Sequence, residues 1–324
     1  MRRTAFTPLG ALYDFGGRVR FALTKPYVAP VPVICVGNVT AGGTGKTPFS
    51  ITLAHGLKAL GHRPHIVTRG YGGSLRGPVQ VDPERHTASE VGDEPLLLSN
   101  AAPTWIAKNR RAGVEHAVSA GADMIVMDDG LQNPSVAKTV SLVLVDGEVG
   151  FGNGRVIPAG PLRESVERCF ARADALILMG EESHRTRAQI AGWRGPVFHA
   201  HLEPNATHIA PQPYIAFAGI ARPDKFFATL DRLGVRMIER VAFPDHHVFT
   251  ESEIKSLISR AKASNARLIT TAKDAVRLDA DQLAHIEALP IVATIASREA
   301  FGRFLIERLA SKQSLLEKST RKMR

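Results

Sequence analysis

A glycine-rich segment followed by lysine and threonine has the residue types that bind phosphate groups. It runs GNVTAGGTGKTP over residues 37–48. Glycines let backbone N–H groups turn toward phosphate oxygens, Lys46 would reach the β- and γ-phosphates, and the Thr47 hydroxyl would ligate Mg²⁺. The sequence therefore predicts a nucleotide-binding loop made of Thr40, Ala41, Gly42, Gly43, Thr44, Gly45, Lys46 and Thr47.

The flanks of this segment supply the elements that a phosphate-binding loop needs. Residues 33–36 are apolar and mostly β-branched, which predicts a buried strand, and a helical pattern opens at Pro48. Strand, glycine loop and helix is the order of a P-loop, in which the helix dipole also favours anions. The common G-x-x-x-x-G-K-[ST] pattern has glycine where this chain has Thr40, so an ordinary glycine-rich turn is the alternative interpretation.

Two adjacent carboxylates end a second predicted strand. Residues 124–127 are apolar, and Asp128, Asp129 and Gly130 follow them. An acidic residue at the end of a strand beside a P-loop is the Walker-B arrangement, which holds Mg²⁺ directly or through water. Neighbouring carboxylates also repel each other unless a cation neutralises them. We interpret Asp128 and Asp129 as metal ligands together with Thr47; a strand-ending Asp-Gly turn is the alternative.

Other polar residues stand in predicted loops, each with a structural alternative. Asp93 precedes a helical run, where a lone aspartate would act as an N-cap. His246 and His247 are adjacent and could ligate a metal, although no second ligand cluster is evident in the sequence. Residues 150–164 are rich in glycine and proline and lack periodicity, which predicts a long functional loop.

The order of predicted strands and helices indicates an α/β protein. Strands are predicted at residues 33–36, 64–69, 104–106, 124–127, 141–145 and 175–179. The composition turns polar and proline-containing at residues 180–213, and a new strand–helix unit starts at residue 214. We predict a P-loop NTPase-like parallel sheet flanked by helices over residues 31–200, followed by a second, smaller α/β domain over residues 201–324.

The composition bounds the partners of the chain. Its 324 residues are 44% hydrophobic and 22% charged, which is ordinary for a soluble globular protein. Two cysteines, Cys35 and Cys169, are too few for a disulfide framework, which favours a reducing cytoplasm. A net charge of +10 suits an anionic partner. No aromatic-rich RNA motif accompanies this charge, so no nucleic-acid partner is predicted.

Residues 1–30 form a basic, aromatic segment. Phe6, Leu9 and Tyr13 fall on one helical face. No apolar run approaches the ~20 residues needed to span a bilayer, and no uninterrupted apolar stretch with a cleavage site marks a signal peptide. This N-terminal amphipathic segment is predicted either to lie in a membrane interface or to pack as a helix on its own domain.

These segments together resemble the tetraacyldisaccharide 4′-kinase family, the lipid A kinases of Gram-negative bacteria. The resemblance runs over nearly the whole chain, and several of the motifs are not general P-loop features. Asn133 departs from it, because histidine is expected at that position. The matching segments are GNVTAGGTGKTP (37–48), TRGYGG (68–73), VGDEP (91–95), DDGLQN (128–133), PAGPLRE (158–164), AFAGIARPDKFF (216–227), FPDHH (243–247) and TAKDAVRL (271–278).

The resemblance implies a lipid kinase that uses ATP and Mg²⁺. Its acceptor would be the 4′-hydroxyl of tetraacyldisaccharide 1-phosphate, the lipid A precursor, at the cytoplasmic face of the inner membrane, where the protein would bind the anionic surface peripherally. A monomer is favoured, with the oligomeric state open. By similarity, Asp93 would be the base at the sugar hydroxyl, paired with His246 from the second domain. The further site residues implied are Lys46, Arg110 (or the adjacent Arg111), Arg163 and Glu164.

Rival hypotheses remain at this point. A membrane-associated partition or maturation ATPase shares the GGxGKT segment, but normally carries lysine where this chain has Thr40. A GTPase is suggested by residues 271–274, TAKD, which resemble a guanine-reading TKxD, although the expected D-x-x-G is one residue short at residues 128–130. A basic, nucleotide-regulated RNA-binding module lacks an RNA motif.

Overall fold

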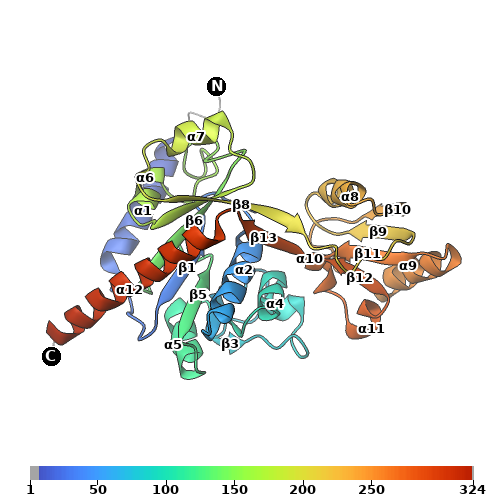
Figure 1. The fold of residues 1–324 in the computed structure, drawn as a ribbon, viewed down its shortest axis with the longest axis horizontal. Coiled ribbons are helices and arrows are strands. Elements are labelled where there is room, and N and C mark those ends of the chain that lie inside the picture. The colour runs from blue at the N-terminus through green and yellow to red at the C-terminus, as the bar shows by residue number, and fades with distance from the viewer. Residues whose placement is uncertain (1–6, 323–324) are drawn as a thin grey trace.

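The computed structural model describes residues 7–322, which form two α/β units, each built on its own sheet (Figure 1). The strands at the centre of the larger sheet are buried along their whole length, so both faces need a cover of helices. The nine strands of this sheet, in spatial order, are β13 (Ile291–Ile295), β8 (Val197–Pro204), β7 (Ala175–Met179), β6 (Val140–Asp146), β1 (Val33–Gly37), β5 (Met124–Asp128), β2 (Pro64–Thr68), β4 (Thr104–Ile106) and β3 (Val79–Gln80).

The strands from β8 to β4 run parallel, whereas β13 and β3 pair antiparallel at the two edges. β1 lies between β6 and β5, with Val36 opposite Asp128, so the ends of β1 and β5 meet at one edge of the sheet. In open parallel sheets the carboxyl ends of the strands are where ligands bind. This register therefore brings the glycine loop and the paired carboxylates together.

Helices follow the strands and cover both faces of the sheet. α2 (Lys46–Ala59) follows β1, and α12 (Arg298–Lys322) packs on the same face of the sheet. The other helices of this unit are α1 (Thr7–Leu23), α3 (Ala88–Val91), α4 (Asp93–Ser99), α5 (Arg110–Ser119), α6 (Val166–Phe170) and α7 (His184–Ile190).

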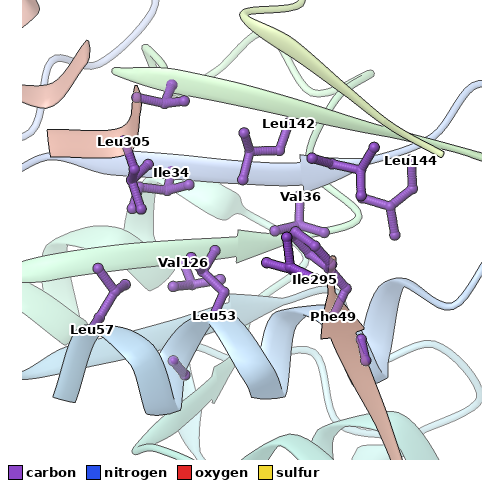
Figure 2. Close-up of a cluster of buried hydrophobic side chains, with 14 of the residues drawn as sticks. Ile34, Val36, Phe49, Leu53, Leu57, Val126, Leu142, Leu144, Ile295 and Leu305 are labelled. Carbon is purple, nitrogen blue, oxygen red and sulfur yellow. The ribbon is translucent and has the colours of Figure 1, made fainter. Parts of the chain in front are cut away.

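Alternate residues of β1 bury opposite faces of the sheet. Ile34 and Val36 belong to the apolar cluster that also contains Phe49, Leu53 and Leu57 of α2 (Figure 2). Each side chain of this kind contributes about 1.5–3 kcal/mol when it is fully buried. Because the same cluster holds the end of β1 and the first turns of α2, it fixes the endpoints of the glycine loop that joins them.

The smaller unit repeats the parallel α/β plan. Its four strands, in spatial order, are β10 (Met237–Ala242), β9 (Tyr214–Ala218), β11 (Arg267–Thr271) and β12 (Ile286–Leu289), all parallel. Its helices are α8 (Pro223–Arg232), α9 (Glu251–Ala263), α10 (Ala272–Ala275) and α11 (Ala280–Leu283). The two sheets with their helices confirm the predicted fold class.

The last strand and helix of the chain belong to the larger unit, which differs from the predicted domain boundary between residues 200 and 201. The sequence assigns all of residues 201–324 to the smaller domain, but β13 pairs with β8 in the larger sheet, and α12 buries Phe301 and Leu305 in the core of that sheet. The chain thus crosses to the smaller unit after β8 and returns through β13, with the two strands side by side (Figure 1). Sequence periodicity does not reveal this return, because it depends on pairing between distant segments.

The N-terminal helix α1 has an exposed apolar surface. Leu12, Phe15 and Leu23 are exposed, while Phe21 lies under the Arg172 guanidinium, 4.3 Å from ring centroid to Cζ. Asp14 ties α1 to α6 through an ion pair of 2.8 Å with Arg168. The helix therefore packs on its own unit and also presents apolar side chains outward. Residues 1–6 of the predicted N-terminal segment, including Phe6, lie outside the described residues, and among those described no helix has the length and hydropathy of a bilayer-spanning segment.

The beginning of the glycine loop leaves no room for a side chain at Gly37. A Cβ there would lie 2.6 Å from Leu131 Cβ and 3.2 Å from Leu131 N. We expect Gly37→Ala to lower the free energy of unfolding by about 1–3 kcal/mol, because the added methyl overpacks the segment after β5. Gly56→Ala is the control, since Gly56 is exposed on α2 with nothing within 4 Å of its added Cβ.

The control substitution should be neutral or stabilising by about 0.4–1 kcal/mol. Urea denaturation followed by circular dichroism measures both variants. Equal denaturation midpoints for Gly37→Ala and Gly56→Ala would contradict the close packing at Gly37.

Candidate active site

The start of α2 is arranged to receive anions. The residue before this helix, Gly45, has a left-handed backbone with φ of +78°, which favours glycine, and no side chain caps the helix there. Its first backbone N–H groups are thus available at the positive end of the helix dipole. The Thr47 side chain, one residue into α2, is buried. This geometry suits the predicted phosphate loop.

Asn38 organises the loop from inside, and the sequence analysis did not identify it. Its Nδ2 donates hydrogen bonds to Thr40 O and Thr44 Oγ1, both at 2.9 Å. Its Oδ1 accepts a hydrogen bond of 3.2 Å from Lys46 Nζ. One buried amide therefore fixes both the curve of the loop and the direction of Lys46.

The glycine- and proline-rich loop predicted at residues 150–164 lies against the phosphate loop. Ala41 N donates to Pro161 O at 2.8 Å, and Arg163 N donates to Val39 O at 2.7 Å. This pairing brings the Arg163 guanidinium to Asp129, where Nη1 lies 3.0 and 2.9 Å from the two carboxylate oxygens. Arg163 therefore faces the same space as the phosphate loop.

Asp128 and Asp129 have different surroundings. Burial is the main cause that raises the pKa of Asp128 to about 7, with Glu94 adding to it. Ser50 Oγ donates to Asp128 Oδ1 at 2.8 Å, and Oδ2 is buried without a partner among residues 7–322. Burial would also raise the pKa of Asp129, but Lys46 (3.6 Å) and Arg163 outweigh it and hold that pKa below its ordinary value.

These surroundings fit a divalent cation. An unpartnered, buried carboxylate oxygen is costly, and hard oxygen ligands are those that Mg²⁺ prefers. The unpartnered Asp128 oxygen, with Asp129 beside it and Thr47 at the start of α2, gives a donor set of this kind.

The structure separates Arg110 from its neighbour Arg111. Arg110 is buried and lines the cleft between the two units, and its Nε has no partner within the described chain. Burial lowers the pKa of Arg110 to about 10, although Asp128 and Asp129 act in the opposite direction. Arg111 is exposed and pairs with Glu115 at 2.8 Å. Of the two arginines, Arg110 is the one with a free donor near the carboxylates.

Glu164 lies behind the cleft rather than in its wall. Its side chain is buried in an ion pair with Arg172 and accepts a hydrogen bond of 2.9 Å from Gln132 Nε2. Gln132 also donates to Asn38 O at 2.8 Å. Glu164 thus supports the phosphate loop from behind, because Gln132 links it to Asn38.

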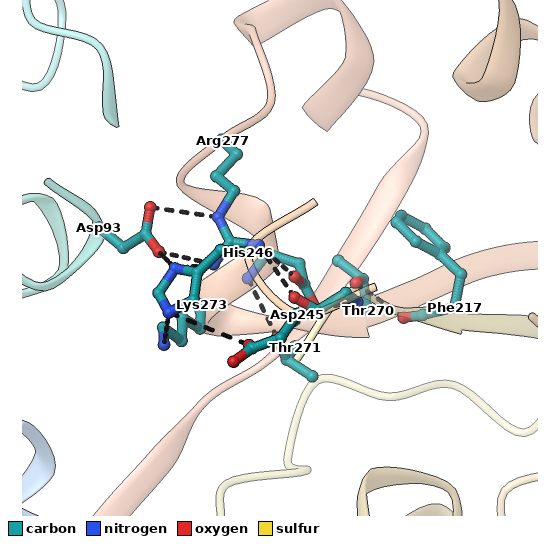
Figure 3. Close-up of polar contacts among 10 residues, drawn as sticks. Asp93, Phe217, Asp245, His246, Thr270, Thr271, Lys273 and Arg277 are labelled. Atoms are coloured by element: carbon teal, nitrogen blue, oxygen red, sulfur yellow. Dashed lines mark hydrogen bonds and ion pairs between the residues drawn. The ribbon is translucent and has the colours of Figure 1, made fainter. Parts of the chain in front are cut away.

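Asp93 and His246 meet across the two units (Figure 3). Asp93 opens α4, and His246 stands in the loop between β10 and α9 with a φ of +57°, which is unusual for a residue with a side chain. His246 Nδ1 lies 3.0 Å from Asp93 Oδ2. The neighbouring His247 instead contacts Glu253 at 3.0 Å and stacks on Phe243.

A third side chain at this contact, Arg277, was missed by the sequence analysis. Arg277 Nε donates to Asp93 Oδ1 at 3.1 Å, and Nη2 donates to Oδ2 at 2.6 Å (Figure 3). Burial would raise the pKa of Asp93, but Arg277, His246 and Lys273 together hold it below its ordinary value. Asp93 is therefore an ionised carboxylate at neutral pH. The signal that could have found Arg277 is its place in the matched TAKDAVRL segment.

The same segment removes the support for a guanine site. Asp274 is completely buried, and its carboxylate accepts hydrogen bonds from Gly219 N (3.1 Å), Thr271 Oγ1 (2.7 Å) and Arg277 Nη1 (2.9 Å). A carboxylate that reads guanine must face its ligand. The TAKD resemblance to a GTPase motif is thus explained by an internal structural role.

The cleft gathers cationic groups from both units. Among the Lys and Arg side chains that line it are Lys46, Arg110 and Arg163 of the larger unit and Arg222, Lys225, Lys273 and Arg277 of the smaller unit. Such a lining attracts strongly anionic ligands. The Asp93 side chain, 11% exposed, lies beside this cleft next to Glu94, which lines it. A phosphate loop and a carboxylate at the same cleft are groups that transfer of a phosphoryl group to a hydroxyl requires.

Comparisons with known proteins agree with this chemistry. The family model described as tetraacyldisaccharide-1-P 4′-kinase matches residues 2–310. The chain is 53% identical over 276 residues to the tetraacyldisaccharide 4′-kinase of Parvibaculum lavamentivorans, covering 84% of this chain and 80% of that protein. It is 48% identical over 309 residues to the enzyme of the same name from Rhodospirillum centenum, covering 94% and 91%.

A solved structure has the same fold. The crystal structure of LpxK from Aquifex aeolicus in complex with ATP superimposes with a TM-score of 0.76 at 25% identity, covering 95% of this chain and 100% of that chain. Sequence and fold thus agree over most of the length of each protein compared. From its matched motifs, its relatives and its architecture, the chain belongs to the tetraacyldisaccharide 4′-kinase family.

Proposed function

We propose that this kinase transfers the γ-phosphate of ATP to the 4′-hydroxyl of a tetraacylated disaccharide 1-phosphate, with Asp93 as the base. The name of its relatives supplies the acceptor. The observation that carries the assignment of roles is the Asp93 carboxylate, held by the smaller unit beside the cleft that the phosphate loop lines. No comparable support exists for the partition ATPase or the GTPase.

The nucleotide side of the reaction is assigned to the larger unit. Backbone N–H groups at the start of α2 would bind the phosphate oxygens, and Lys46, oriented by Asn38, would contact the transferred group. Arg163 and Arg110 line the same cleft and would neutralise charge that develops during transfer. The crystal structure of the Aquifex aeolicus relative contains ATP, which supports this nucleotide.

A divalent cation fits the carboxylates after β5. Asp128, through its unpartnered oxygen, would hold Mg²⁺ together with Asp129 and Thr47. When bound, Mg²⁺ supplies neutralisation of phosphate charge. The chain's own contribution is a buried site that already holds Asp129 ionised beside Lys46 and Arg163.

The acceptor side of the reaction is assigned to Asp93 and His246. Asp93 would accept the proton of the 4′-hydroxyl as that oxygen bonds to the γ-phosphorus. The bond from phosphorus to the β,γ-bridging oxygen breaks, and ADP leaves with the electron pair. His246, 3.0 Å from the carboxylate, would orient Asp93 and share the proton. Because the two residues lie on different units, docking of the units would complete the site and exclude water.

The exposed apolar side chains of α1 support a peripheral membrane role. Leu12, Phe15 and Leu23 would enter the lipid interface, and Arg18 and Arg20, which are exposed on the same helix, would contact anionic headgroups. This placement suits an acceptor that carries four acyl chains. The corresponding location is the cytoplasmic face of the inner membrane, where ATP is available.

Replacing Lys46 tests the nucleotide side. We expect Lys46→Met to lower transfer of labelled γ-phosphate from ATP to the disaccharide 1-phosphate by roughly 10²–10³-fold, because one charge-stabilising group is lost. Lys58→Met is the control, since Lys58 lies exposed in the last turn of the same helix. Thin-layer separation of the labelled lipid measures both variants. Wild-type transfer by Lys46→Met, or no labelled lipid from the unaltered protein, would refute the proposal.

Replacing the exposed apolar side chains of α1 tests the membrane role. We expect the triple variant Leu12→Ser, Phe15→Ser and Leu23→Ser to lose flotation with anionic vesicles, because burial of these side chains in lipid drives binding. Binding of the unaltered protein should weaken as salt screens the arginines. Ile306→Ser, an exposed site on α12, is the control. Equal flotation of the triple variant and the control would place the membrane contact elsewhere.

A further inference from the structure

Arg277 is held by several polar contacts in the cleft. Its side chain is 6% exposed, yet it lies at the surface where the two units meet. Two of its nitrogens contact the two oxygens of Asp93, at 3.1 and 2.6 Å. Such bidentate pairing fixes both the position and the plane of a carboxylate, which a single point charge does not.

The other side of Arg277 is tied to the ends of two strands in the smaller sheet. Its Nη1 donates to Asp274 Oδ1 at 2.9 Å and to Gly219 O at 3.1 Å. Asp274 is in turn held by Gly219 N and by Thr271 Oγ1. Gly219 follows β9 and Thr271 ends β11, so a short chain of hydrogen bonds connects the smaller sheet to Asp93.

The side chains that lower the pKa of Asp93 come from the smaller unit, whereas its own helix adds another carboxylate. The side chains with this effect on Asp93 are Arg277, His246 and Lys273, all from the smaller unit. Its own helix contributes Glu94, a carboxylate. Asp245 and Asp274 lie behind this shell, near His246 and Arg277 respectively. Removal of the smaller unit's charges would leave a largely buried carboxylate without compensation, a state that favours its neutral form.

We propose that Arg277 is a positioning residue that holds and aims the Asp93 carboxylate, so that the base on the larger unit depends on a side chain of the smaller unit. This proposal rests on the assignment of Asp93 as the base. The two contacts use one lone pair on each carboxylate oxygen, and a carboxylate has about four, so sites remain for the acceptor hydroxyl and for His246. Arg277 itself touches neither substrate nor phosphate in this scheme.

The pH dependence of kcat/KM distinguishes this role from a merely structural one, because it reports ionisations of the free enzyme. Asp93 must be deprotonated to act, and its pKa is low while Arg277 is present, so activity should persist into the acid range. In Arg277→Met the same carboxylate stays buried without its main partner, and its pKa rises. The acidic limb of the kcat/KM profile of Arg277→Met should therefore lie about one pH unit or more above that of the unaltered enzyme.

The magnitude of kcat gives a second readout. We expect Arg277→Met to lower kcat at neutral pH by roughly 10–100-fold through misalignment of Asp93. Arg277→Lys keeps the positive charge but loses the bidentate geometry. Its kcat, and the pH of the acidic limb of its kcat/KM profile, should therefore lie between those of Arg277→Met and the unaltered enzyme. Arg240→Met is the matched control, because Arg240 forms an exposed ion pair with Asp231 in the same unit. It should leave kcat and the profile unchanged.

Three results would overturn the proposal. They are an unshifted acidic limb in folded Arg277→Met, a profile and kcat of Arg277→Lys identical to those of the unaltered enzyme, and a shift of equal size in Arg240→Met. If Arg277→Met does not fold, the comparison of Arg277→Lys with the unaltered enzyme decides the outcome. Asp93→Asn separates the two assumptions: an active Asp93→Asn refutes the base itself, whereas an inactive one with an unshifted Arg277→Met refutes only the role of Arg277.

Discussion

Carboxylates that are withdrawn from water need compensating positive charge. Asp129, Asp93 and Asp128 differ in where that charge comes from. Asp129 obtains it locally, from Lys46 and Arg163 of its own unit. Asp93 obtains it from across the cleft, through Arg277. Asp128 has one oxygen without a partner among the described residues, and its pKa is raised to about 7, chiefly by burial. The first arrangement orders the phosphate loop, the second couples the two units, and the third leaves a position that suits a metal ion.

The topology explains why these arrangements are possible in one chain. Parallel strands end at the same edge of a sheet, so β1 and β5 deliver the phosphate loop and the paired aspartates side by side. The smaller sheet uses the same rule, since the loops after β9 and β11 supply Gly219 and the segment with Arg277. β8 and β13 pair antiparallel in the larger sheet, and the chain leaves for the smaller unit after β8 and returns at β13. α12 then closes the core of the larger sheet. Loops at the carboxyl ends of strands in both sheets thus line one cleft.

Local sequence patterns predicted the parts of this site that are formed by neighbouring residues. The strand at residues 104–106, the strand at residues 175–179, the glycine loop and the Asp128–Asp129 pair all follow from hydrophobic runs and glycine spacing. The contact of Asp93 with His246 was expected only through the family resemblance, because 153 positions separate them. Arg277, 184 positions from Asp93, had no local signal that pointed to a partner. Glu164 matched a motif, yet only packing could reveal that Arg172 and Gln132 occupy its carboxylate.

A double-mutant cycle on kcat tests most directly whether a base shared between the two units acts on the acceptor hydroxyl. We expect Asp93→Asn and His246→Ala each to lower kcat by roughly 10²-fold or more, with ATP binding preserved. If the two residues act as one unit, the double variant should be scarcely slower than the slower single variant. His247→Ala, the adjacent histidine that contacts Glu253, should retain most activity. Additive losses in the cycle, or an unaffected His246→Ala beside an inactive His247→Ala, would contradict the account.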